Sequence, residues 1–576
     1  MTTYDDKPWL TSYDSSVTPH IDLPEMTFVD FIDRGFAFNP RRAAFHFSGK
    51  SFSFEELDNW SLRLASFLRE INCKKGDVVG VNLPNTPQYL ISIAGITRAG
   101  CAVSGVSPLL SPKEMIHQLN DSGASVLITL DALFAGRIVG VKDKIPKLKH
   151  IIVTNVADFL PPVKRFLGKL LKKVPTGKVE PIAGKKVVWF KDVLRDYPAE
   201  KLNIDLSGDD ICLLQYTGGT TGPSKGTILT HANLIANTFQ YAQWFDEDSN
   251  AKSRIEEVEL GKEVVCSGFP FFHQAGLAIG MLNMGFATTQ ILVPDPRNTD
   301  NICRDLRKYR PTVLVNVPTL YQMLLENPMF KTIDFSGCKY CLSGAAPFGV
   351  DSILALEKVV GEGKVIEVYG MTETSPLITM NPLKGRKKIG SVGIPIQNTR
   401  VKIVDVETGT KEIPLGEPGE IIVNGPQVMK GYHNKPEATA KTKKEFQNET
   451  WMYTGDIAKM DEDGFIYIVD RAKDMLLVGG FNVYSKEVEE TLYEIPDVEF
   501  CAIVGIPNPE REGSEIVKAV IQLATDSRQK DKPALEKAIT AYCRENMAPY
   551  KVPKIIEFVD EIPLTSVGKV DKKSLR

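Results

Sequence analysis

Short apolar runs rich in β-branched residues alternate with helix-length segments between about residues 78 and 370. These runs predict strands at residues 78–82, 125–129, 151–154, 211–217, 264–268, 312–317, 340–343 and 365–369. Nearly continuous apolar strands separated by helices are typical of parallel sheets that helices cover on both faces. We therefore expect an α/β fold whose large N-terminal domain, residues 1–470, contains two doubly covered mixed sheets.

The pattern changes after residue 391, where shorter strands at 400–404 and 419–424 are separated by Gly and Pro turns. This change predicts a small β-rich subdomain at about 391–470. Further strand-like runs lie at 465–469, 475–478, 498–504, 516–523 and 555–559, and helical segments lie at 485–493 and 534–546. We expect a small α+β C-terminal domain, residues 471–576.

The composition limits the classes of function that the chain can have. Of its 576 residues, 43% are apolar and 24% are charged, so the chain can bury a large core. Lys and Arg number 69 against 72 Asp and Glu, a net charge of −3, which gives no global field to attract nucleic acid. Nine cysteines without a disulfide spacing, and a polar N-terminus without a signal-peptide pattern, predict a cytoplasmic protein.

One stretch, residues 264–294, contains no Asp, Glu, Lys or Arg and has the hydropathy of a membrane span. It is interrupted by polar residues such as Gln274 and Asn283 and by several glycines. This mixture predicts a strand, a helix and a second strand in a protein core, and no transmembrane helix.

The segment 216–226 reads YTGGTTGPSKG and follows an apolar strand, before a helix that we expect to begin near His231. Glycines allow backbone amides to approach closely, and short hydroxyls with one cation complete the donors that a triphosphate needs. The Walker A pattern is excluded, because Gly226 follows Lys225 where that pattern has Ser or Thr. The candidate phosphate-binding residues are Thr217, Gly218, Gly219, Thr220, Thr221, Gly222, Ser224 and Lys225.

Further motifs follow in order: FPFFH at 269–273, SGAAP at 343–347, YGMTE at 369–373, YTGD at 453–456, DRAKD at 470–474 and GK at 568–569. Together with the segment 216–226, they resemble the adenylate-forming superfamily over nearly the whole chain. That superfamily contains acyl-CoA synthetases, luciferases and peptide-synthetase adenylation domains. The resemblance implies that a carboxylate attacks the α-phosphate of ATP, with Mg²⁺, to form an acyl-adenylate. A mobile C-terminal domain then reorients so that the thiol of coenzyme A can attack.

The resemblance implies how the nucleotide is held. Tyr369 would stack on adenine, Asp456 in a YTGD turn would accept the ribose hydroxyls, and Arg471 would reach the ribose and phosphates. The other residues expected in this site are Gly344, Ala345, Ala346, Gly370 and Thr372.

Candidate catalytic residues are Thr217, Lys225, Glu373 and Lys569. A carboxylate beside a phosphate loop repels the nucleotide unless a cation lies between them, so Glu373 is the candidate Mg²⁺ ligand. The resemblance implies that Lys569 bridges the substrate carboxylate and the α-phosphate and offsets the charge that develops there. It also places the hinge at Lys473, and directs Gly479 and Gly480 toward the channel for coenzyme A.

The acyl pocket is expected to include His273, Gly344 and Gly370, although His273 can equally be a core residue. Acetyl- and propionyl-CoA synthetases have a tryptophan at the position that matches Gly370, so glycine implies an open pocket into which a side chain here would point. Residues 7–13 and the segment near 160 also resemble bacterial long-chain fatty acyl-CoA synthetases. We expect ATP-dependent ligation of a medium- or long-chain fatty acid to coenzyme A, with release of AMP and pyrophosphate. An aryl-acid CoA ligase and a luciferase-like oxygenase stay open.

Residues 163–174 have the pattern of a basic amphipathic helix. Apolar residues on one face are Val163, Phe166, Leu167, Leu170, Leu171 and Val174, and basic residues on the other are Lys164, Arg165, Lys169, Lys172 and Lys173. Such a helix suits reversible contact with the inner face of the membrane, where fatty acids partition. A solvated helix packed on its own domain is an equal alternative, and a homodimer stays open.

Overall fold

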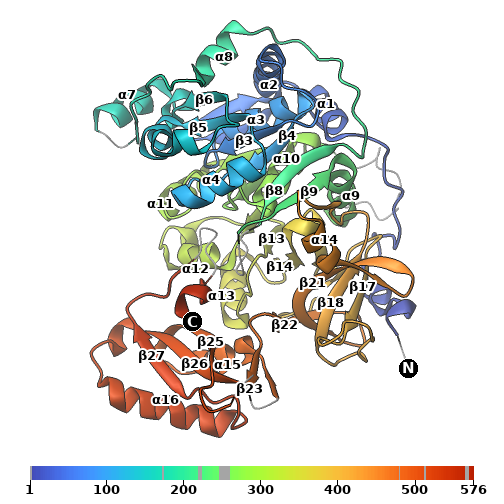
Figure 1. Cartoon of the computed structure of the whole chain (residues 1–576), viewed down its shortest axis with the longest axis vertical. Coiled ribbons are helices and arrows are strands. Elements are labelled where there is room, and N and C mark those ends of the chain that lie inside the picture. The colour runs from blue at the N-terminus through green and yellow to red at the C-terminus, as the bar shows by residue number, and fades with distance from the viewer. Residues whose placement is uncertain are drawn as a thin grey trace.

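The computed structural model describes residues 3–171, 174–217, 223–245, 260–478, 481–511, 514–564 and 570–576, without the side chains of residues 169, 170 and 482. Two large sheets form the upper part of the molecule, a β-rich unit lies beside them, and an α+β layer forms the lower end (Figure 1). This arrangement confirms the α/β fold class expected from the sequence.

The first large sheet has the strand order β19-β9-β8-β4-β3-β5-β6-β7. The strands are Gly431–Tyr432 (β19), Gly226–Thr230 (β9), Ile211–Tyr216 (β8), Ala102–Gly105 (β4), Val78–Asn82 (β3), Val126–Leu130 (β5), His150–Thr154 (β6) and Lys186–Trp189 (β7). Strands β8 to β7 are parallel, whereas β9 and β19 are antiparallel additions at one edge. The nearby helices are Phe54–Glu70 (α2), Pro87–Arg98 (α3), Pro112–Asp121 (α4), Pro162–Leu170 (α7) and Phe190–Asp196 (α8).

The second large sheet has the order β16-β15-β14-β13-β12-β10-β11-β1-β2. The strands are Ile394–Pro395 (β16), Leu377–Met380 (β15), Val365–Gly370 (β14), Tyr340–Ser343 (β13), Val313–Asn316 (β12), Val264–Ser267 (β10), Thr289–Leu292 (β11), Ala43–Phe47 (β1) and Lys50–Ser53 (β2). The strands from β14 to β1 are parallel. The associated helices are Phe28–Phe38 (α1), Thr299–Tyr309 (α11), Pro318–Glu326 (α12) and Val350–Val360 (α13).

Helix α10, Gln274–Gly285, lies between the two sheets. It packs against α1, α3 and α9 (His231–Ala242), and against β10 and β11. The charge-free stretch is therefore strand, helix and strand in the core, as expected. Across the described ranges, we find no helix with the length and apolar character needed to cross a membrane.

The β-rich unit has the order β17-β18-β21-β20, with β22 paired to β21. Its elements are Arg400–Val404 (β17), Gly419–Asn424 (β18), Pro436–Thr442 (α14), Lys443–Phe446 (β20), Glu449–Met460 (β21) and Ile466–Arg471 (β22). The α+β layer follows, with Leu476–Val478 (β23), Phe481–Val483 (β24), Ser485–Tyr493 (α15), Val498–Pro507 (β25), Glu515–Leu523 (β26), Lys532–Asn546 (α16) and Ile555–Val559 (β27). This layer has its own hydrophobic cluster, drawn from residues 476–552. The domain boundary near residue 470 stays a prediction.

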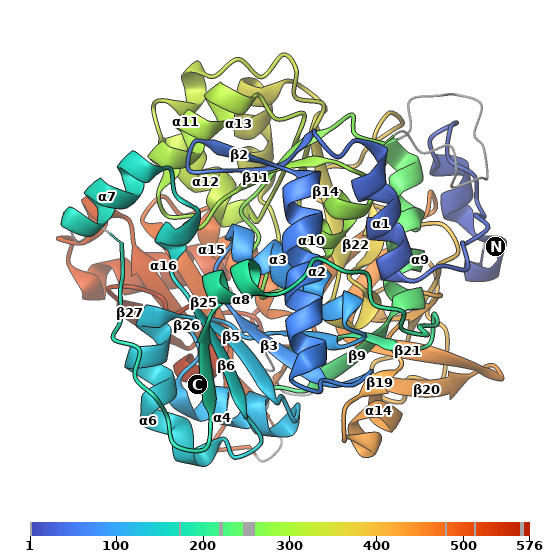
Figure 2. The same ribbon diagram turned by 90° about the horizontal axis from the view of Figure 1, so that it is seen from above.

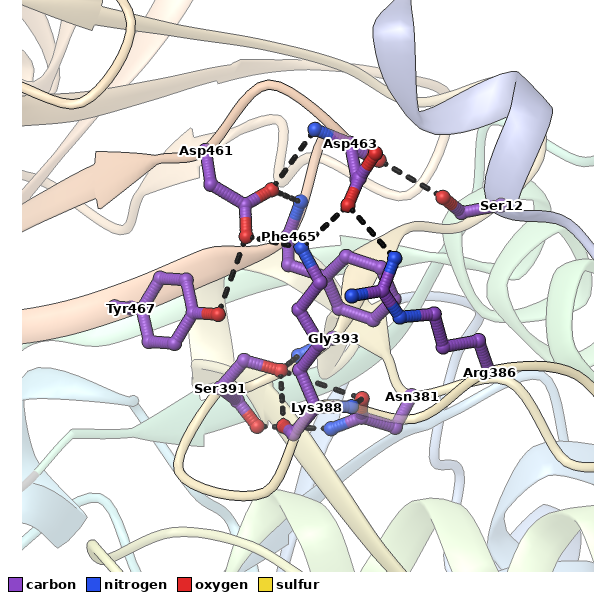
Figure 3. A network of polar contacts seen from close by, with 10 residues as sticks. All are labelled: Ser12, Asn381, Arg386, Lys388, Ser391, Gly393, Asp461, Asp463, Phe465 and Tyr467. Atoms are coloured by element: carbon purple, nitrogen blue, oxygen red, sulfur yellow. Dashed lines mark hydrogen bonds and ion pairs between the residues drawn. The ribbon is translucent and has the colours of Figure 1, made fainter.

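The first residues of the chain pack against the β-rich unit. Tyr4 and Trp9 are buried in a cluster with strands β14 to β18, β21 and β22. The Ser12 hydroxyl donates to the carbonyl of Asp463 at 2.9 Å, in the turn between β21 and β22. Lys388 donates to the carboxylates of Asp461 and Asp463 at 2.6 and 2.7 Å (Figure 3). The N-terminal segment therefore helps to hold the hairpin that ends at Arg471.

Candidate active site

A large cleft, ≈ 2940 Å³ in volume, lies between the sheets, the β-rich unit and the C-terminal layer. The cleft is lined by residues of the segment 216–226 and of the FPFFH, SGAAP, YGMTE, YTGD and DRAKD motifs. The reason is topological: β10, β13 and β14 are parallel strands of one sheet, so the loops that follow them emerge at the same edge. Of the sequence-predicted residues, Gly218 to Gly222, Gly479, Gly480 and Lys569 lie outside the described residues.

The phosphate segment follows the expected strand, β8, and joins it to the antiparallel strand β9 in a hairpin connection. Strand β9, which lies between this segment and the expected helix, was not predicted from the sequence. The Thr217 amide donates to the Lys225 carbonyl at 3.1 Å and closes the base of this hairpin. Residues 226–230 form a run too short to be recognised as a strand next to the glycine-rich segment. Helix α9 begins at His231, as expected. Thr217, Ser224 and Lys225 all line the cleft.

Asp456, Tyr369 and Arg471 form a hydrogen-bonded group at one end of the cleft. The Tyr369 hydroxyl donates to Asp456 Oδ2 at 2.6 Å, and Arg471 Nε lies 2.9 Å from Asp456 Oδ1. Asp456 is 2% exposed, and burial together with this carboxylate raises the pKa of Tyr369 well above its usual value. The expected YTGD turn is wrong: Asp456 lies within β21, opposite Arg471 of β22, and Gly455 has a φ of 73°.

Glu373 and Lys225 approach a common aromatic ring at the phosphate end of the cleft. The Tyr432 hydroxyl donates to Glu373 Oε1 at 2.6 Å, and Lys225 Nζ lies 4.1 Å from the centre of the Tyr432 ring. Burial and the neighbouring carboxylate raise the pKa of Tyr432. Tyr432 comes from the short edge strand β19 and carries no sequence signal of its own. It was therefore missed by the motif analysis.

The Glu373 carboxylate fits a Mg²⁺ site of the kind completed by a nucleotide. Glu373 is 6% exposed and lines the cleft, and among the described residues only its Oε1 atom accepts a side-chain hydrogen bond. Among those residues, no group of three or more His, Cys, Asp or Glu side chains could hold a metal by itself. Mg²⁺ is commonly held by one or two carboxylates together with substrate phosphates, which matches a single glutamate here.

Gly370 lines the cleft, but its place in the backbone contradicts the expected role in pocket depth. A Cβ atom at this position would meet the carbonyl oxygen of Pro376 at 1.8 Å. That carbonyl accepts hydrogen bonds from the Met371 amide and the Thr374 hydroxyl. A side chain at position 370 would therefore displace the turn that carries Thr372 and Glu373, and would not simply point along the acyl chain.

One face of α10 lines the same cleft, and we call the part of the cleft along this face the channel. The apolar residues on this face are Ala275, Ala278, Ile279, Leu282 and, just beyond the helix, Phe286. From Gln274 to Phe286 the helical rise gives a length of about 18 Å. Val265, Val313 and Val315, from the adjacent strands β10 and β12, also line the cleft. The SGAAP loop, in which Ala345 has a φ of 68°, borders the same cleft.

His273 is half-buried at the start of α10. Its Nδ1 atom accepts the amide hydrogen of Ala275 at 3.4 Å, which caps α10, and the residue also lines the cleft. Two further polar residues of this helix, Gln274 and Asn283, were seen in the sequence only as interruptions of an apolar stretch. Both are 1% exposed and line the cleft. Their signal was present, because an amide in a charge-free core helix needs an explanation.

The segment after β22 is tied to the C-terminal tail. Arg576 donates to the carbonyl of Lys473 and pairs with Asp474, both at 3.2 Å. Lys572 pairs with the half-buried Glu489 at 2.7 Å and donates to Ser485 Oγ at 2.6 Å. Burial lowers the pKa of Lys473. These contacts place the tail that follows residue 569 against the expected hinge.

The sequence matches the family described as AMP-binding enzyme over residues 32–433, and the AMP-binding enzyme C-terminal domain over residues 487–569. The chain belongs to the AMP-binding enzyme family. This confirms the resemblance to the adenylate-forming superfamily.

Relatives of this AMP-binding enzyme are similar over nearly their whole length. A long-chain-fatty-acid–CoA ligase of Bacillus subtilis (strain 168) is 39% identical, with 99% of this chain and 97% of the relative covered. One of Escherichia coli O6:H1 is 36% identical, with 99% and 98% covered. A feruloyl-CoA synthase of Amycolatopsis sp is 32% identical, with 93% and 96% covered.

Solved structures are similar to this AMP-binding enzyme as well. The anthranilate CoA ligase AuaEII, in complex with anthranoyl-AMP, has a TM-score of 0.79 and 27% identity, with 96% of this chain and 98% of that chain covered. ATP-bound MatB from Rhodopseudomonas palustris has a TM-score of 0.77 and 27% identity, with 96% and 98% covered.

Proposed function

We propose that this AMP-binding enzyme ligates a long-chain fatty acid to coenzyme A through an acyl-adenylate, with release of AMP and pyrophosphate. The observation that carries the fatty-acid assignment is the channel along α10, which is about 18 Å long by its helical rise and apolar over most of its length. It opens at the end of the cleft where the motif residues gather. The relatives named as long-chain-fatty-acid–CoA ligases support the same substrate class.

In the first step, a carboxylate oxygen of the fatty acid attacks the α-phosphorus of ATP, and the bond to the β-phosphate oxygen breaks as pyrophosphate leaves. Lys225 and the Thr217 backbone border the place where the leaving phosphates would lie. Lys569 would offset the charge that develops on the α-phosphate, in the manner of a pre-organised donor. Leu564 and Val570, which flank its segment, pair with each other and line the cleft.

Mg²⁺ would be held by Glu373 together with the phosphates, and would supply charge neutralisation to the departing pyrophosphate. Tyr432 keeps the Glu373 carboxylate in place, because its hydroxyl donates to Oε1 and leaves Oε2 for other partners. Asp456 would accept the ribose hydroxyls. Without nucleotide, its oxygens accept a hydrogen bond from Tyr369 and pair with Arg471. The ribose hydroxyls would therefore replace at least one of these two contacts.

In the second step, the sulfur of coenzyme A attacks the acyl carbonyl, the bond from that carbon to the phosphate oxygen breaks, and AMP leaves. We propose that residues after 471 turn about Lys473 between the two steps. The contacts across this hinge are polar: Lys486 Nζ donates to the Ile468 carbonyl at 2.8 Å, and Ser485 Oγ donates to Asp470 Oδ1 at 3.1 Å. Polar contacts of this kind can be exchanged without exposing a hydrophobic core.

The test is a CoA-ligation screen over acids from acetate to palmitate, with benzoate and ferulate included. We expect the highest kcat/KM for long saturated acids, because each buried methylene contributes about 0.8 kcal/mol. The readouts are AMP release and thioester formation. A maximum at benzoate or ferulate would replace the fatty-acid assignment with an aryl acid, and AMP release without thioester would contradict CoA ligation.

We also propose that α7 contacts a lipid surface reversibly. Its apolar side chains point to solvent: Val163 is 69% exposed and Phe166 is 68% exposed. Two of its basic residues contact the protein: Lys164 donates to the Ser48 carbonyl at 2.7 Å, and Arg165 lies 3.9 Å from Asp158. The helix lies at the margin of the molecule in both views (Figures 1 and 2). This orientation supports a lipid surface over a face packed on its own domain.

The apolar face gives a sharper test than the lysines. Changing Val163, Phe166 and Leu167 to Ser should reduce binding to anionic phospholipid vesicles at least about tenfold, since a fully buried side chain of this kind contributes about 1.5–3 kcal/mol. Phe38→Ser, at another exposed phenylalanine, is the matched control and should not change binding. Absence of vesicle binding in the parent protein would contradict the proposal.

A further inference from the structure

We propose that the far part of the acyl channel is a subsite for a hydroxyl group on the distal half of the fatty acid, with Asn283 as the specificity-determining residue. The inference rests on the proposed fatty-acid CoA ligation and names a narrower substrate class. Asn283 lies on α10 and lines the cleft, yet it is 1% exposed. Among the described residues, neither its amide nitrogen nor its amide oxygen has a hydrogen-bond partner.

An unpartnered amide is costly in such a position. Leaving a buried donor or acceptor without a partner costs about 1–3 kcal/mol per group, and most buried polar side chains are paired. Asn283 follows Ile279 and Leu282 along the lined face of the helix, so a hydrocarbon chain in the channel would pass the amide without offering it a hydrogen bond. A hydroxyl can both donate and accept, and it therefore matches an amide that presents one acceptor and two donors.

The depth of Asn283 decides where the hydroxyl must lie on the acid. Asn283 is nine residues beyond Gln274, which is about 13.5 Å along the helix axis at 1.5 Å per residue. Gln274 also lacks amide partners, but it begins the helix beside His273, at the end where the carboxylate reacts. Between them the channel wall is apolar, with Ala278 and Ile279. A hydroxyl is therefore expected to be disfavoured in mid-chain and favoured further out.

Other polar groups gather at the same far end. Thr288 lines the channel and is 6% exposed. The channel also reaches Glu263 and Lys339, whose side chains pair at 2.9 Å, and the second oxygen of Glu263 is buried without a partner among the described residues. A channel built only for a hydrocarbon terminus would end in apolar residues. The polar end supports an oxygenated chain.

The experiment compares palmitate with positional isomers of hydroxypalmitate, from mid-chain to the ω position, by kcat/KM for AMP release with the full-length protein. We expect at least one distal isomer to exceed palmitate about tenfold, and mid-chain isomers to fall below it. In Asn283→Leu this ratio should drop about tenfold, through faster turnover of palmitate and slower turnover of the distal isomer. Met281→Leu, on the core-facing side of α10, is the matched control and should leave the ratio unchanged.

The outcomes separate the inference from the proposed function. Palmitate turnover without a preference for any distal isomer in the parent protein overturns the hydroxyl subsite and leaves fatty-acid ligation in place. A distal preference that Asn283→Leu does not change overturns the role of Asn283. Failure of the parent to adenylate any of these acids contradicts the proposed function itself. Because the isomer series is measured on the parent, the inference can be overturned even if the variant does not fold.

Discussion

The buried polar side chains at the two ends of the cleft differ in whether they have hydrogen-bond partners within the protein. At the nucleotide end, the Asp456 carboxylate accepts a hydrogen bond from Tyr369 and pairs with Arg471, and the Glu373 carboxylate accepts a hydrogen bond from Tyr432. At the acyl end, Asn283 is buried without a described partner. A nucleotide must therefore replace existing hydrogen bonds and ion pairs, whereas a polar acyl group would make hydrogen bonds that the protein alone does not make. The free-energy cost of binding therefore differs between the two ends.

The largest effect on the rate of adenylation should come from removal of the Lys569 charge, which would act only at the nucleotide end. Lys569→Ala is expected to lose about 100-fold or more in adenylation, the size of one pre-organised charge-stabilising donor. Thioester formation from supplied acyl-adenylate should be nearly unchanged, because no α-phosphate charge develops in that step. The two half-reactions are measured separately by pyrophosphate release and by thioester formation. Equal loss in both would contradict the assignment.

Asp456→Ala should lower kcat/KM for ATP and leave the affinity for the fatty acid unchanged. Hydrogen bonds to charged groups contribute about 1.5–3 kcal/mol, so kcat/KM for ATP should fall about 10- to 100-fold. The affinity for a fatty acid, measured by binding without ATP, should stay the same. A parallel loss of fatty-acid affinity would mean that the two ends of the cleft are not independent. Tyr369→Phe removes one contact to the same carboxylate and is the milder companion variant.

Gly370→Trp tests whether this position belongs to the backbone or to the acyl pocket. Because a Cβ here meets the Pro376 carbonyl at 1.8 Å, the side chain must displace the turn that carries Glu373. Overpacking of this kind costs about 1–3 kcal/mol, so adenylation should fall about tenfold for acetate as well as for long acids. Pyrophosphate release across a chain-length series is the measurement. Selective loss of long acids, with acetate spared, would restore the pocket interpretation.

The smallest effect concerns stability. Burial raises the pKa of Glu367, two residues before Tyr369, to about 7. Because this pKa is above that of the unfolded chain, the folded protein binds the extra proton, and the stabilisation is present below about pH 4.5 and is lost as pH rises through about 7. Glu367→Gln should therefore raise Tm by a few degrees at pH 8 and much less at pH 5. Equal shifts at both pH values would exclude titration of Glu367 as the cause.

Much of the fold could be predicted because its strands are apolar and clearly bounded. Strands β13, β17, β18 and β27 and helix α15 have the bounds that the sequence indicated. The short antiparallel strands β9 and β19 could not be predicted, because a run of two to five residues becomes a strand only when a neighbouring strand supplies its hydrogen bonds. The YTGD motif was read as a turn for the same reason, since Gly455 bends a strand that its neighbours hold.

The candidate site could be predicted where residues form ordered motifs and not where contacts cross the fold. The positions of Tyr369, Asp456 and Arg471 follow from their motifs, but their mutual hydrogen bonds depend on how β14 meets β21 and β22. Tyr432 and Asn283 belong to no motif, and only tertiary packing brings them to the cleft. The direction of a Cβ at Gly370 is likewise a property of the folded turn at residues 371–376, which no residue pattern records.

The attachment of the N-terminal segment sets an order on folding during synthesis. Ser12 and Asp463 are 451 residues apart in the chain, and Trp9 packs so closely on Gly464 that a Cβ there would meet its backbone at 2.4 Å. At roughly 5–20 residues per second, a ribosome needs about 20–90 seconds to add that distance. Tyr4 and Trp9 are made long before these partners, and until then they are exposed apolar side chains that a chaperone can bind.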